Sequence, residues 1–580
     1  MDTGSGDDIG ARTRSRRARG DGGTPTEPGS ASYMMDMAFM VVNGPKSISD
    51  AMRSSEKEKW MDAINTELQC LEDHETWEVI QPGGLPAEAR PITSRVVLQD
   101  KIGQNRTVER YKARLVAHGF RQRPGIDFDD TYSPTLSFPA VRMALSKAAA
   151  EDKEIIHLDV VTAFLESKVQ EDLYLQLPKE LVVGKDGKVG LNRHRQVSSP
   201  AVVKLKRSLY GLRQSGQKWY HTFDRYIVYN MGMSRSQFEA GIYISPSGAI
   251  LVIWVDDILL IGTKKEVHWM KKQLEERFTI KDLGPVHYFL SMLIERDRQE
   301  RRVYISQETY LNHILERFDM GECKGCDTPV VAGVKLQKED RKELEVDKQL
   351  YQEAIGSLTY ASITTRPDIA YATGVAGRFS DKPTTPHWEA VKRIFRYLQG
   401  TKHLRLALGS LEKEQSLGIR VFADTDFAGE VDTLKSTTGI AILDRFGSLV
   451  YWKSKRQTTV AKSNTDAEFT ATAMAVEEGI WILNLDSEIF PHAASKPRSP
   501  LKVYNDNQAS IANLANGRYR PSTRHVGVRY FWLRELVENG EVGVDYLNTG
   551  DMVADGFTKG LERVKHEKCL SMLSMISLAG

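Results

Sequence analysis

Cysteine is scarce in this chain, with four residues among 580. Small secreted folds that depend on disulfides carry far more, so a disulfide scaffold is excluded. Cys323 and Cys326 form a single C-x-x-C pair, and neither Cys70 nor Cys569 has a nearby partner in the sequence that would complete a zinc site. We interpret the pair as two incidental thiols, and zinc binding is the less favoured alternative.

Long apolar runs are missing as well. No stretch approaches the roughly 20 apolar residues that a membrane-spanning helix requires. The opening sequence, MDTGSGDDIG, lacks the apolar core of a secretory signal. We therefore expect an intracellular protein without membrane contact. A hydrophobic content of 41% and a charged content of 27% are typical of folded proteins, and the length predicts about three or four domains.

Neither sign of charge dominates, because 79 Lys and Arg oppose 77 Asp and Glu and leave a net charge of +2. A local basic groove is enough to hold phosphates, so this balance neither supports nor excludes nucleic-acid binding. Residues 1–45 are rich in Gly, Ser and Arg without apolar periodicity, which predicts a disordered arm. The arm contains a basic cluster, which consists of Arg12, Arg14, Arg16, Arg17 and Arg19. This cluster is either a tail for nuclear import or nucleic-acid binding, or simply part of a solvated flexible arm.

After the arm, helical and strand patterns alternate. An amphipathic helix is predicted over Ser49–Leu71, because apolar side chains recur there at helical spacing, namely Trp60, Ile64, Leu68 and Leu71. Weakly periodic stretches near residues 328–348 and 408–417 indicate domain boundaries. We therefore expect a catalytic block in residues 46–320, a helical segment in 321–412 and a compact α/β domain in 413–580.

Two adjacent acids stand inside an apolar run, LVIWVDDILLIG, from Leu251 to Gly262. Burying unpaired carboxylates costs several kcal/mol, so a fold accepts them only with a cation or another partner. Two apolar strands joined by a tight turn would present Asp256 and Asp257 at the tip of one hairpin. We favour metal ligation for this pair over the alternative, an ordinary surface turn.

A third acid comes from IIHLDVVTAFLE, where Asp159 follows a short apolar strand. Two divalent cations about 3.5–4 Å apart can stabilise the attacking and leaving oxygens of a phosphoryl transfer. Mg²⁺ suits such a site because it accepts carboxylate oxygens together with substrate phosphates. Asp159 would join Asp256 and Asp257 as a ligand, although by itself it could equally be a strand-end acid.

Several longer motifs occur in one order, and together they resemble the reverse transcriptase region of copia-type (Pseudoviridae-like) retrotransposon Pol polyproteins. The resemblance runs from about Ser49 to the C-terminus. It is carried by RYKARLVAHGF (110–120), GIDFDDTYSP (125–134), LDVVTAFL (158–165), SLYGLRQSGQKWY (208–220), WVDD (254–257), DLG (282–284), TRPDI (365–369) and RYLQGT (396–401).

The resemblance implies an α/β chain folded as a right-hand polymerase, with fingers and palm in residues 46–320 and a thumb or connection in 321–412. It places Asp159, Asp256 and Asp257 on the family's metal-binding triad. Two Mg²⁺ ions, or Mn²⁺ as a substitute, are implied for each active site.

The same resemblance assigns roles to residues that would otherwise attract no attention. Lys112 and Arg114 would contact the incoming triphosphate, or they belong to a solvated alternating strand. Gln214 would support the 3′ side of the nucleotide, or it is a polar residue near a helix start. Phe164 would exclude a 2′-hydroxyl and so select deoxynucleotides; without the resemblance it is simply a core aromatic residue.

A second pattern begins after residue 415. GIRVFADTDFA predicts an alternating strand that contains Asp424, and GIAILDR and SLVYWKS predict a hairpin joined through Phe446 and Gly447. Thr465 and Glu468 have the spacing of a capping box, which would place Glu468 in the first turn of a helix.

Further along, a strand over Leu501–Asn505 ends at Asp506, a helix follows, and Asp555 stands near the C-terminus. The order of these elements resembles the RNase H fold, with a mixed five-stranded sheet in residues 413–580. Four acids would hold two Mg²⁺ ions around the scissile phosphate, whereas each alone could be a solvated surface group: Asp424, Glu468, Asp506 and Asp555. His525 would assist near the leaving group, or it is a surface histidine.

Some positions depart from the family pattern. Gly527 and Phe531 replace an acid and a histidine in RHVGVRYFWLRE, Gly216 replaces a proline, and Arg95-Val96 replaces Lys-Trp. None of these changes removes a predicted ligand, but they suggest a second hypothesis, a decayed and inactive copy that at most binds nucleic acid. A third hypothesis, an RNA-synthesising polymerase, is disfavoured by Phe164.

The sequence therefore predicts an RNA-directed DNA polymerase with RNase H. Its expected partners are an RNA template, a DNA primer, an RNA–DNA hybrid and deoxynucleoside triphosphates, in a cytoplasmic virus-like particle or the nucleus. Motifs for a protease, an integrase and a coat protein are missing, so we expect those proteins from elsewhere and interpret the chain as a processed or truncated product. The oligomeric state is not predicted.

Overall fold

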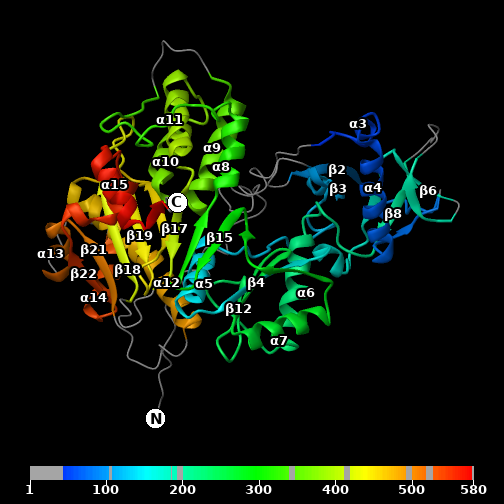
Figure 1. Cartoon of the computed structure of the whole chain (residues 1–580), viewed down its shortest axis with the longest axis horizontal. Helices are drawn as coiled ribbons and strands as arrows, with labels where there is room; N and C mark the ends of the chain where they lie inside the picture. The colour runs from blue at the N-terminus through cyan, green and yellow to red at the C-terminus, as the bar shows by residue number, and fades with distance from the viewer. Residues whose placement is uncertain are drawn as a thin grey trace.

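A computed structural model describes residues 44–81, 83–102, 108–184, 186–192, 200–338, 346–410, 418–490, 500–516 and 527–577. The predicted arginine cluster and His525 lie outside these residues, as does almost all of the predicted arm. A small lobe that contains α3, α4, β2, β3, β6 and β8 stands apart from a large lobe that contains β4, β12, β15, β17 and β18 (Figure 1). None of the described helices is both long and apolar enough to cross a membrane.

The small lobe is built on a five-stranded sheet in the order β1-β8-β5-β2-β3. Its strands are β1 (Trp77–Val79), β8 (Val202–Leu205), β5 (Tyr174–Gln176), β2 (Ile92–Ile102) and β3 (Val108–Ala117). A short hairpin, β6 (Leu181–Val183) and β7 (Val189–Leu191), and a 3-10 turn, η1 (Gly119–Arg121), complete the lobe. The helix α4 (Lys57–Asp73) packs on β3 through the four apolar side chains predicted for that role, Trp60, Ile64, Leu68 and Leu71.

The single helix predicted over Ser49–Leu71 is wrong in one respect, because the structure divides it into α3 (Ile48–Ala51) and α4. The Ser54 hydroxyl donates to the carbonyl oxygen of Ala51 at 2.7 Å. A serine hydroxyl that binds a nearby backbone carbonyl competes with the helical hydrogen-bond ladder, so the first helix ends there.

The centre of the molecule is a six-stranded sheet in the order β13-β4-β12-β11-β10-β9. The strands are β13 (Ile280–Pro285), β4 (Glu154–Val160), β12 (Asp257–Gly262), β11 (Ile250–Trp254), β10 (Ile242–Ile244) and β9 (Ser234–Arg235). The helices α6 (Ser215–Tyr229) and α7 (Lys264–Glu275) bury apolar side chains against one face of this sheet. The helix α5 (Phe138–Ala150) packs on the other face.

A helical segment follows, with α8 (Glu308–Arg317), α9 (Lys348–Thr364), η3 (Pro367–Ile369), α10 (Ala370–Gly377) and α11 (Thr385–Thr401). Beside these helices is a sheet in the order β14-β15-β16-β17-β23. Its strands are β14 (Tyr288–Phe289), β15 (Met292–Asp297), β16 (Arg302–Ser306), β17 (Leu404–Leu408) and β23 (Met575–Ser577). Because β23 pairs with β17, the end of the chain returns to a sheet begun before the helices.

The C-terminal sheet has the order β20-β19-β18-β21-β22. It contains β20 (Leu449–Arg456), β19 (Thr437–Leu443), β18 (Arg420–Asp426), β21 (Leu501–Asn505) and β22 (Val542–Tyr546). The first three strands are antiparallel, and β21 and β22 run parallel to β18. The surrounding helices are α12 (Asn464–Ile489), α13 (Gln508–Asn516), α14 (Gly527–Glu538) and α15 (Arg563–Met572), with short turns η6 (Thr549–Asp551) and η7 (Val553–Phe557).

This mixed five-stranded sheet confirms the predicted α/β class and the RNase H order of elements. The predicted hairpin through Phe446 and Gly447 is also present, as β19 and β20. The alternating pattern predicted for the strand with Asp424 is wrong, because β18 is buried at five consecutive positions. Helix α12 contacts β18, as does η7, so this central strand has no solvent-facing side.

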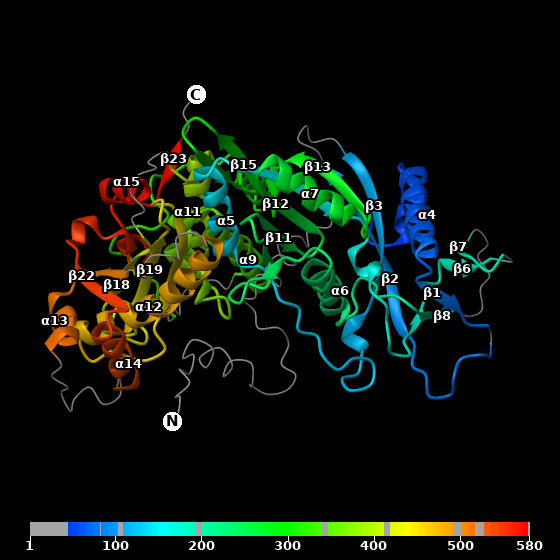
Figure 2. The ribbon, with the colours of Figure 1, turned by 90° about the horizontal axis from the view of Figure 1, so that it is seen from below.

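One helix joins the central sheet to the C-terminal sheet. All residues of α5 except Pro139 are buried, and both views show α5 inside the large lobe beside α12 (Figures 1 and 2). Arg142 of α5 donates to the carbonyl oxygens of Val450, Ile363 and Thr364 at 2.8, 3.1 and 2.9 Å. Its guanidinium lies 3.9 Å from the centre of the Trp452 ring. The two sheets and α9 therefore share one core rather than meeting at a solvated interface.

Replacing Arg142 with methionine keeps most of the buried volume and removes every donor. Each of the carbonyl oxygens bound by Arg142 would lose that donor, at about 1–3 kcal/mol for a buried group left unsatisfied. We expect Arg142→Met to lower the free energy of unfolding by about 3 kcal/mol or more, measured by urea titration. The exposed Arg225→Met on α6 is the matched control, with an expected change within about 0.5 kcal/mol. Equal losses in both variants would contradict the shared core.

Candidate metal centres

The first set of predicted acids lies at one end of the central sheet. The predicted hairpin is present, but Trp254 pairs with Asp257, so the two-residue turn between β11 and β12 consists of Val255 and Asp256 rather than of the two acids. Val255 has a φ of 55°, a conformation that costs a β-branched residue on the order of 1–3 kcal/mol. The Trp219 indole nitrogen donates to the carbonyl oxygen of Val255 at 2.6 Å and holds the turn in place.

Asp159 comes to the same place from β4. It stands directly opposite Asp257 in the register of β4 and β12, and the Val160 amide donates to the carbonyl oxygen of Asp256 at 2.8 Å. Burial raises the pKa of Asp256, and the neighbouring charge of Asp257 adds to the rise. The structure thus brings the three acids to one sheet end, where their mutual repulsion favours a bound cation.

His157 is a residue of this centre that the sequence reasoning missed. Its Nε2 lies 3.0 Å from Oδ1 of Asp257, and the side chain is buried. Because side chains alternate along a strand, His157 shares a face of β4 with Asp159. The signal available in the sequence was a polar side chain two positions before the predicted ligand Asp159.

One cation and two aromatic rings gather near these acids. The Arg114 guanidinium lies 4.5 Å from the centre of the Tyr210 ring. That ring meets Phe164 edge-on, with the ring centres 5.0 Å apart. Burial raises the pKa of Tyr210 to about 12, the positive charge of Arg114 opposes the rise, and Asp256 adds to it. Arg114, Tyr210 and Phe164 therefore form one group that faces Asp256, and Tyr210 was not predicted.

Lys112 and Gln214 have different surroundings. Lys112 lies two residues before Arg114 on β3, and the charges of both act on the partly buried Glu67 carboxylate of α4. Gln214 is 1% exposed. Its amide nitrogen donates to the carbonyl oxygen of Asp127 at 2.9 Å, and its amide oxygen accepts from Gln122 at 2.9 Å. The protein engages both ends of the Gln214 amide with one hydrogen bond each, and the nucleotide contact of Gln214 stays a prediction.

The second centre is tighter. Within the part of the chain that the structure describes, one group of three acids brings an oxygen of each member within 4.8 Å of the others, and it consists of Asp424, Glu468 and Asp506. Asp424 comes from β18, Glu468 from α12, and Asp506 directly follows β21. Adjacent strand ends and a crossing helix therefore gather acids that are far apart in the sequence.

Hydrogen bonds fix each of these carboxylates. The Thr558 hydroxyl donates to Asp424 at 2.6 Å, the Asn505 amide donates to Glu468 at 3.1 Å, and the Thr549 hydroxyl donates to Asp506 at 2.7 Å. Each of these donors binds one of the two oxygens of its carboxylate. An all-oxygen group of this kind suits Mg²⁺ or Mn²⁺.

The pKa values of these acids show how strongly they repel one another. Burial raises the pKa of Asp424 to about 6, and the nearby Asp555 carboxylate contributes. Burial and then Asp424 raise the pKa of Glu468 to about 9. A fold that keeps these groups together without a cation has to hold a proton on Glu468 at neutral pH.

The fourth predicted ligand, Asp555 on η7, has a cationic partner of its own. The Lys559 ammonium donates to Asp555 at 2.9 Å. Burial alone would lower the pKa of Lys559, but Asp424 and Asp555 outweigh burial and raise it. Lys559 thus lies among the acids and was missed, although its spacing of four residues from Asp555 was visible in the sequence.

The predicted capping box of α12 is wrong. The helix begins at Asn464 and its cap is Ser463, whose hydroxyl accepts from the amide of Asp466 at 3.2 Å. Glu468 therefore lies beyond the first turn and faces the acids instead of capping the helix. His525 lies outside the described residues.

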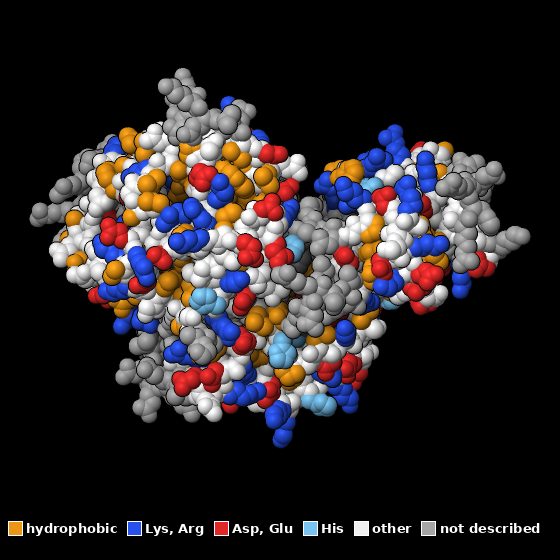
Figure 3. Space-filling model, turned by 45° about the horizontal axis from the view of Figure 1, so that its top comes forward, with side chains coloured by type: hydrophobic (Ala, Val, Ile, Leu, Met, Phe, Trp, Pro, Cys, Tyr) orange, Lys and Arg blue, Asp and Glu red, His pale blue; other side chains and the backbone are white. Residues whose placement is uncertain are grey.

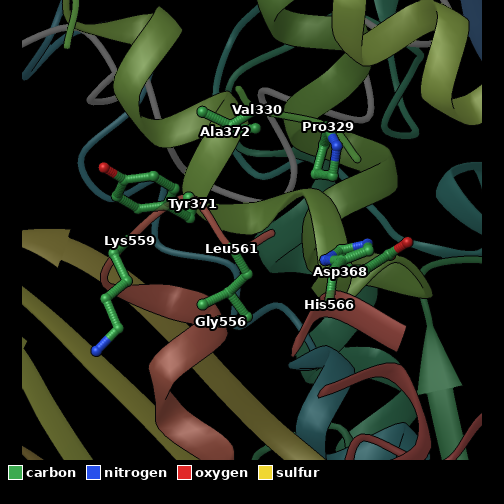
Figure 4. A pocket seen from close by; sticks show the side chains of 10 residues that line it. Pro329, Val330, Asp368, Tyr371, Ala372, Gly556, Lys559, Leu561 and His566 are labelled. Carbon is green, nitrogen blue, oxygen red and sulfur yellow. The ribbon is translucent and has the colours of Figure 1, made fainter. Parts of the chain in front are cut away.

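Two motifs without a predicted role meet beside this centre. Arg366 and Asp368 form a buried ion pair at 2.6 Å, the Tyr397 hydroxyl donates to Asp368 at 2.7 Å, and His566 Nε2 lies 2.9 Å from that hydroxyl. Asp368 and His566 line one side of a small pocket, and Lys559 points away from them on the other (Figure 4). The motifs TRPDI and RYLQGT thus fasten α15 to the helical segment.

The raised pKa of Glu468 has a measurable consequence. An unfolded chain would release this proton near pH 4.3, whereas the fold retains it to about pH 9. This group therefore contributes stability at acidic pH that is lost as the pH rises toward 9. In metal-free buffer, a rise in pH from about 5 to about 8 should lower the free energy of unfolding of the parent more than that of Glu468→Gln. We expect the difference to be about 1 kcal/mol or more. Urea unfolding measures this, and curves parallel to the parent would contradict it; the exposed Glu88→Gln is the control.

Comparisons with known proteins agree with this architecture. Residues 74–332 match the family described as "Reverse transcriptase (RNA-dependent DNA polymerase)". The chain is 36% identical over 549 residues to the "Retrovirus-related Pol polyprotein from transposon TNT 1-94" of Nicotiana tabacum, covering 92% of this chain and 39% of that protein. It is 30% identical over 547 residues to the corresponding polyprotein from transposon RE1 of Arabidopsis thaliana, covering 94% and 35%.

Among solved structures, the chain is similar to a foamy viral protease-reverse transcriptase in complex with double-stranded DNA. The TM-score is 0.46 and the identity 11%, over 85% of this chain and 70% of that one. The chain spans less than two fifths of the length of the two plant polyproteins. On the family match and these relatives, the chain belongs to the copia-type retrotransposon Pol polyproteins, as a reverse transcriptase region followed by an RNase H-like region.

Proposed function

We propose that this chain is an RNA-directed DNA polymerase that also cuts the RNA strand of RNA–DNA hybrids. The observation that carries the proposal is the close group of Asp424, Glu468 and Asp506, in which burial and the charge of Asp424 raise the pKa of Glu468 to about 9. For the polymerase centre, the support is that Asp159, Asp256 and Asp257 lie at one end of the central sheet, where burial and the charge of Asp257 raise the pKa of Asp256. Residues 46–320 then form fingers and palm, 321–412 the thumb or connection, and 413–580 the nuclease domain.

At the polymerase centre, Asp159, Asp256 and Asp257 would hold two Mg²⁺ ions, with Mn²⁺ as a substitute. Bound there, the ions supply charge stabilisation for the phosphoryl oxygens of the deoxynucleoside triphosphate. His157 keeps the Asp257 carboxylate in one orientation through its 3.0 Å contact. Arg114, whose guanidinium lies 4.5 Å from the centre of the Tyr210 ring, would offer its planar donors to the triphosphate.

Selection of the sugar would fall to Phe164. Tyr210 packs edge-on against its ring and restricts the rotamers that Phe164 can adopt. A fixed ring beside the sugar would clash with a 2′-hydroxyl, which a ribonucleotide has and a deoxynucleotide lacks. Lys112 would add positive charge on β3, the strand of the proposed fingers that also carries Arg114.

At the nuclease centre, Asp424, Glu468 and Asp506 would hold the cations, and Asp555 would join them. Bound there, Mg²⁺ supplies an activated water and charge stabilisation at the scissile phosphate. Thr558 and Asn505 hold two of the carboxylates at fixed positions before the substrate arrives. The Lys559 ammonium stands beside Asp555, so loading that side of the site requires Lys559 to move or to contact the phosphate itself.

The partners follow from these two reactions: an RNA template, a DNA primer, the hybrid and deoxynucleoside triphosphates. A notch separates the small lobe from the large one, and Lys and Arg side chains gather on the rim of the small lobe (Figure 3). Integrase, protease and coat proteins would come from other chains or other parts of a polyprotein.

The competing hypothesis is an inactive copy. It is supported by the salt bridge between Lys559 and Asp555, because that bridge occupies one of the predicted metal ligands.

Separate loss of the two activities tests the proposal. We expect Asp256→Asn to reduce oligo-dT-primed extension on poly-rA by at least about 100-fold and to leave hybrid cutting intact, because the carboxylate is lost at one centre alone. Asp424→Asn should do the reverse. The exposed Asp129→Asn is the control for both. A folded parent protein that neither extends primers nor cuts hybrids would support the inactive copy.

The role of Phe164 is tested by the choice between sugars. Phe164→Val removes the ring, so we expect the preference for dTTP over UTP in kcat/KM to fall about 10-fold or more. Phe164→Tyr keeps the ring and should retain the preference. Unchanged discrimination in the valine variant would assign Phe164 to the core alone.

A further inference from the structure

A buried polar cluster joins the helical segment to the C-terminal domain beside the nuclease acids. Its members are Arg366 and Asp368 of TRPDI, Tyr397 of RYLQGT and His566 of α15. Neither of the two proposed reactions uses these side chains. A buried ion pair adds little stability by itself, but it demands a fixed geometry of its partners. Such a cluster is therefore suited to holding two elements in one relative position.

Hydrogen bonds orient every member of the cluster. The Arg366 guanidinium donates twice to the Asp368 carboxylate, at 3.0 and 2.6 Å, and once to the Thr401 hydroxyl at 2.7 Å. The Tyr397 hydroxyl donates its single hydrogen to Asp368, so its oxygen accepts from His566 Nε2, which lies 2.9 Å away. Burial lowers the pKa of His566, so at neutral pH the imidazole is uncharged and its proton is on Nε2. Each bond thus sets the direction of the next.

The space beside the cluster is too small for a substrate. Asp368 and His566 line a pocket of about 10 Å³ (Figure 4), which has room for about one water molecule. Gly556 of η7 lines the same pocket. The cluster therefore acts on the neighbouring segment, which contains Asp555, and not on a bound ligand.

The helix α15 connects the cluster to η7. One turn after His566, Cys569 packs directly on Gly556, where an added Cβ would lie only 2.5 Å from the Cys569 sulfur. Burial raises the pKa of Cys569 to about 12, and the charges of Asp368 and Asp555 add to the rise. The thiol is thus within electrostatic reach of both the cluster and the predicted metal ligand.

Close contacts hold η7 on two sides. On the side of the sheet, an added Cβ at Gly439 of β19 would lie 2.7 Å from the Ala554 carbonyl oxygen. On the side of α15, the contact is the one between Gly556 and Cys569. Asp555 stands between Ala554 and Gly556 in the chain, so a shift of α15 would displace its carboxylate.

Asp555 depends on this support because its own bond is a flexible one. Hydroxyl and amide donors of the C-terminal domain bind the other three predicted ligands, namely Thr558, Asn505 and Thr549. Asp555 is bonded by Lys559, whose long stem can turn with the carboxylate. The position of the Asp555 carboxylate is therefore set by the position of η7.

We propose that Asp368, Tyr397 and His566 are positioning residues of the nuclease centre, which fix α15 and through it the Asp555 carboxylate beside Asp424. The inference rests on the proposed nuclease function and deepens it, because it makes the helical segment a part of that centre. The three residues act through Asp555 and touch neither the cation nor the RNA.

A pair of substitutions at His566 tests the cluster. His566→Leu removes the donor to Tyr397, whereas His566→Gln keeps a nitrogen donor of similar reach. Calorimetry measures Mn²⁺ binding in the full-length chain that also carries Asp256→Asn, and the heat lost on adding Asp424→Asn identifies the nuclease centre. We expect His566→Leu to weaken this binding about 10-fold and His566→Gln to stay within about threefold. The exposed Tyr229→Phe is the control and should change nothing.

An exchange of size tests the contact between α15 and η7. Gly556→Ala forces a methyl group against the Cys569 sulfur and should raise the Kd for Mn²⁺ about 10-fold. Adding Cys569→Ala removes that sulfur, so the double variant should return to within about threefold of the parent. A double variant that binds Mn²⁺ as weakly as Gly556→Ala alone would contradict the proposed route.

Hybrid cutting separates positioning from a loss of stability. With the polymerase centre intact, we expect His566→Leu to lower kcat while the KM for the hybrid is unchanged. Half-maximal cutting should require about 10-fold more Mg²⁺, and primer extension should stay within about twofold of the parent. A variant that unfolds at lower urea concentration but binds Mn²⁺ as the parent does would show a structural role alone and overturn the proposal.

The positioning role and the nuclease function fail in different ways. If the parent cuts hybrids, and both His566→Leu and Gly556→Ala bind Mn²⁺ as the parent does, the positioning role is overturned and the nuclease function stands. If the parent cuts nothing, the nuclease function is overturned, and Mn²⁺ binding, which needs no cutting, decides the positioning role. The Gly556→Ala series decides it if His566→Leu does not fold.

Discussion

A single buried guanidinium connects the two halves of this protein. Arg142 binds carbonyl oxygens of β20 and α9 and lies on the Trp452 ring, while its own helix packs on the central sheet. A charge that is 3% exposed is tolerated only where the geometry of its partners is fixed. The spacing between the two acid centres is therefore a property of the core, not of a flexible linker.

The same low-polarity surroundings explain the character of the acid centres. Burial and mutual repulsion raise the pKa of Glu468 to about 9 and that of Asp424 to about 6, so the metal-free fold carries stored electrostatic strain. Thr558 and Asn505 hold these carboxylates in place and prevent them from relaxing apart. The strained Val255 turn, held by Trp219, serves the same purpose at the other centre. Rigid support of repelling groups is what a cation site requires.

Much of the fold could be predicted from the sequence because the patterns that indicate it are local. The apolar run around Asp256 and Asp257 predicts a hairpin from strand period and turn length, and the structure has that hairpin. The order of elements after residue 415 was predicted for the same reason. Two predictions failed for different reasons. Ser463 rather than Thr465 caps α12, because Ser463 makes the local hydrogen bond to the Asp466 amide. The strand β18 is buried at consecutive positions rather than alternating, because α12 and η7 pack on it.

The sequence by itself determined which acids stand at strand ends and in what order, since short-range periodicity places each strand and its boundary. Tertiary structure alone decided what those residues meet. It buried Gln214 between Gln122 and Asp127, placed Lys559 among the acids, and set Arg142 against Val450, 308 residues away. The physical reason is that burial and electrostatic coupling depend on distance in space, and a chain of this length brings together partners that no local pattern can pair.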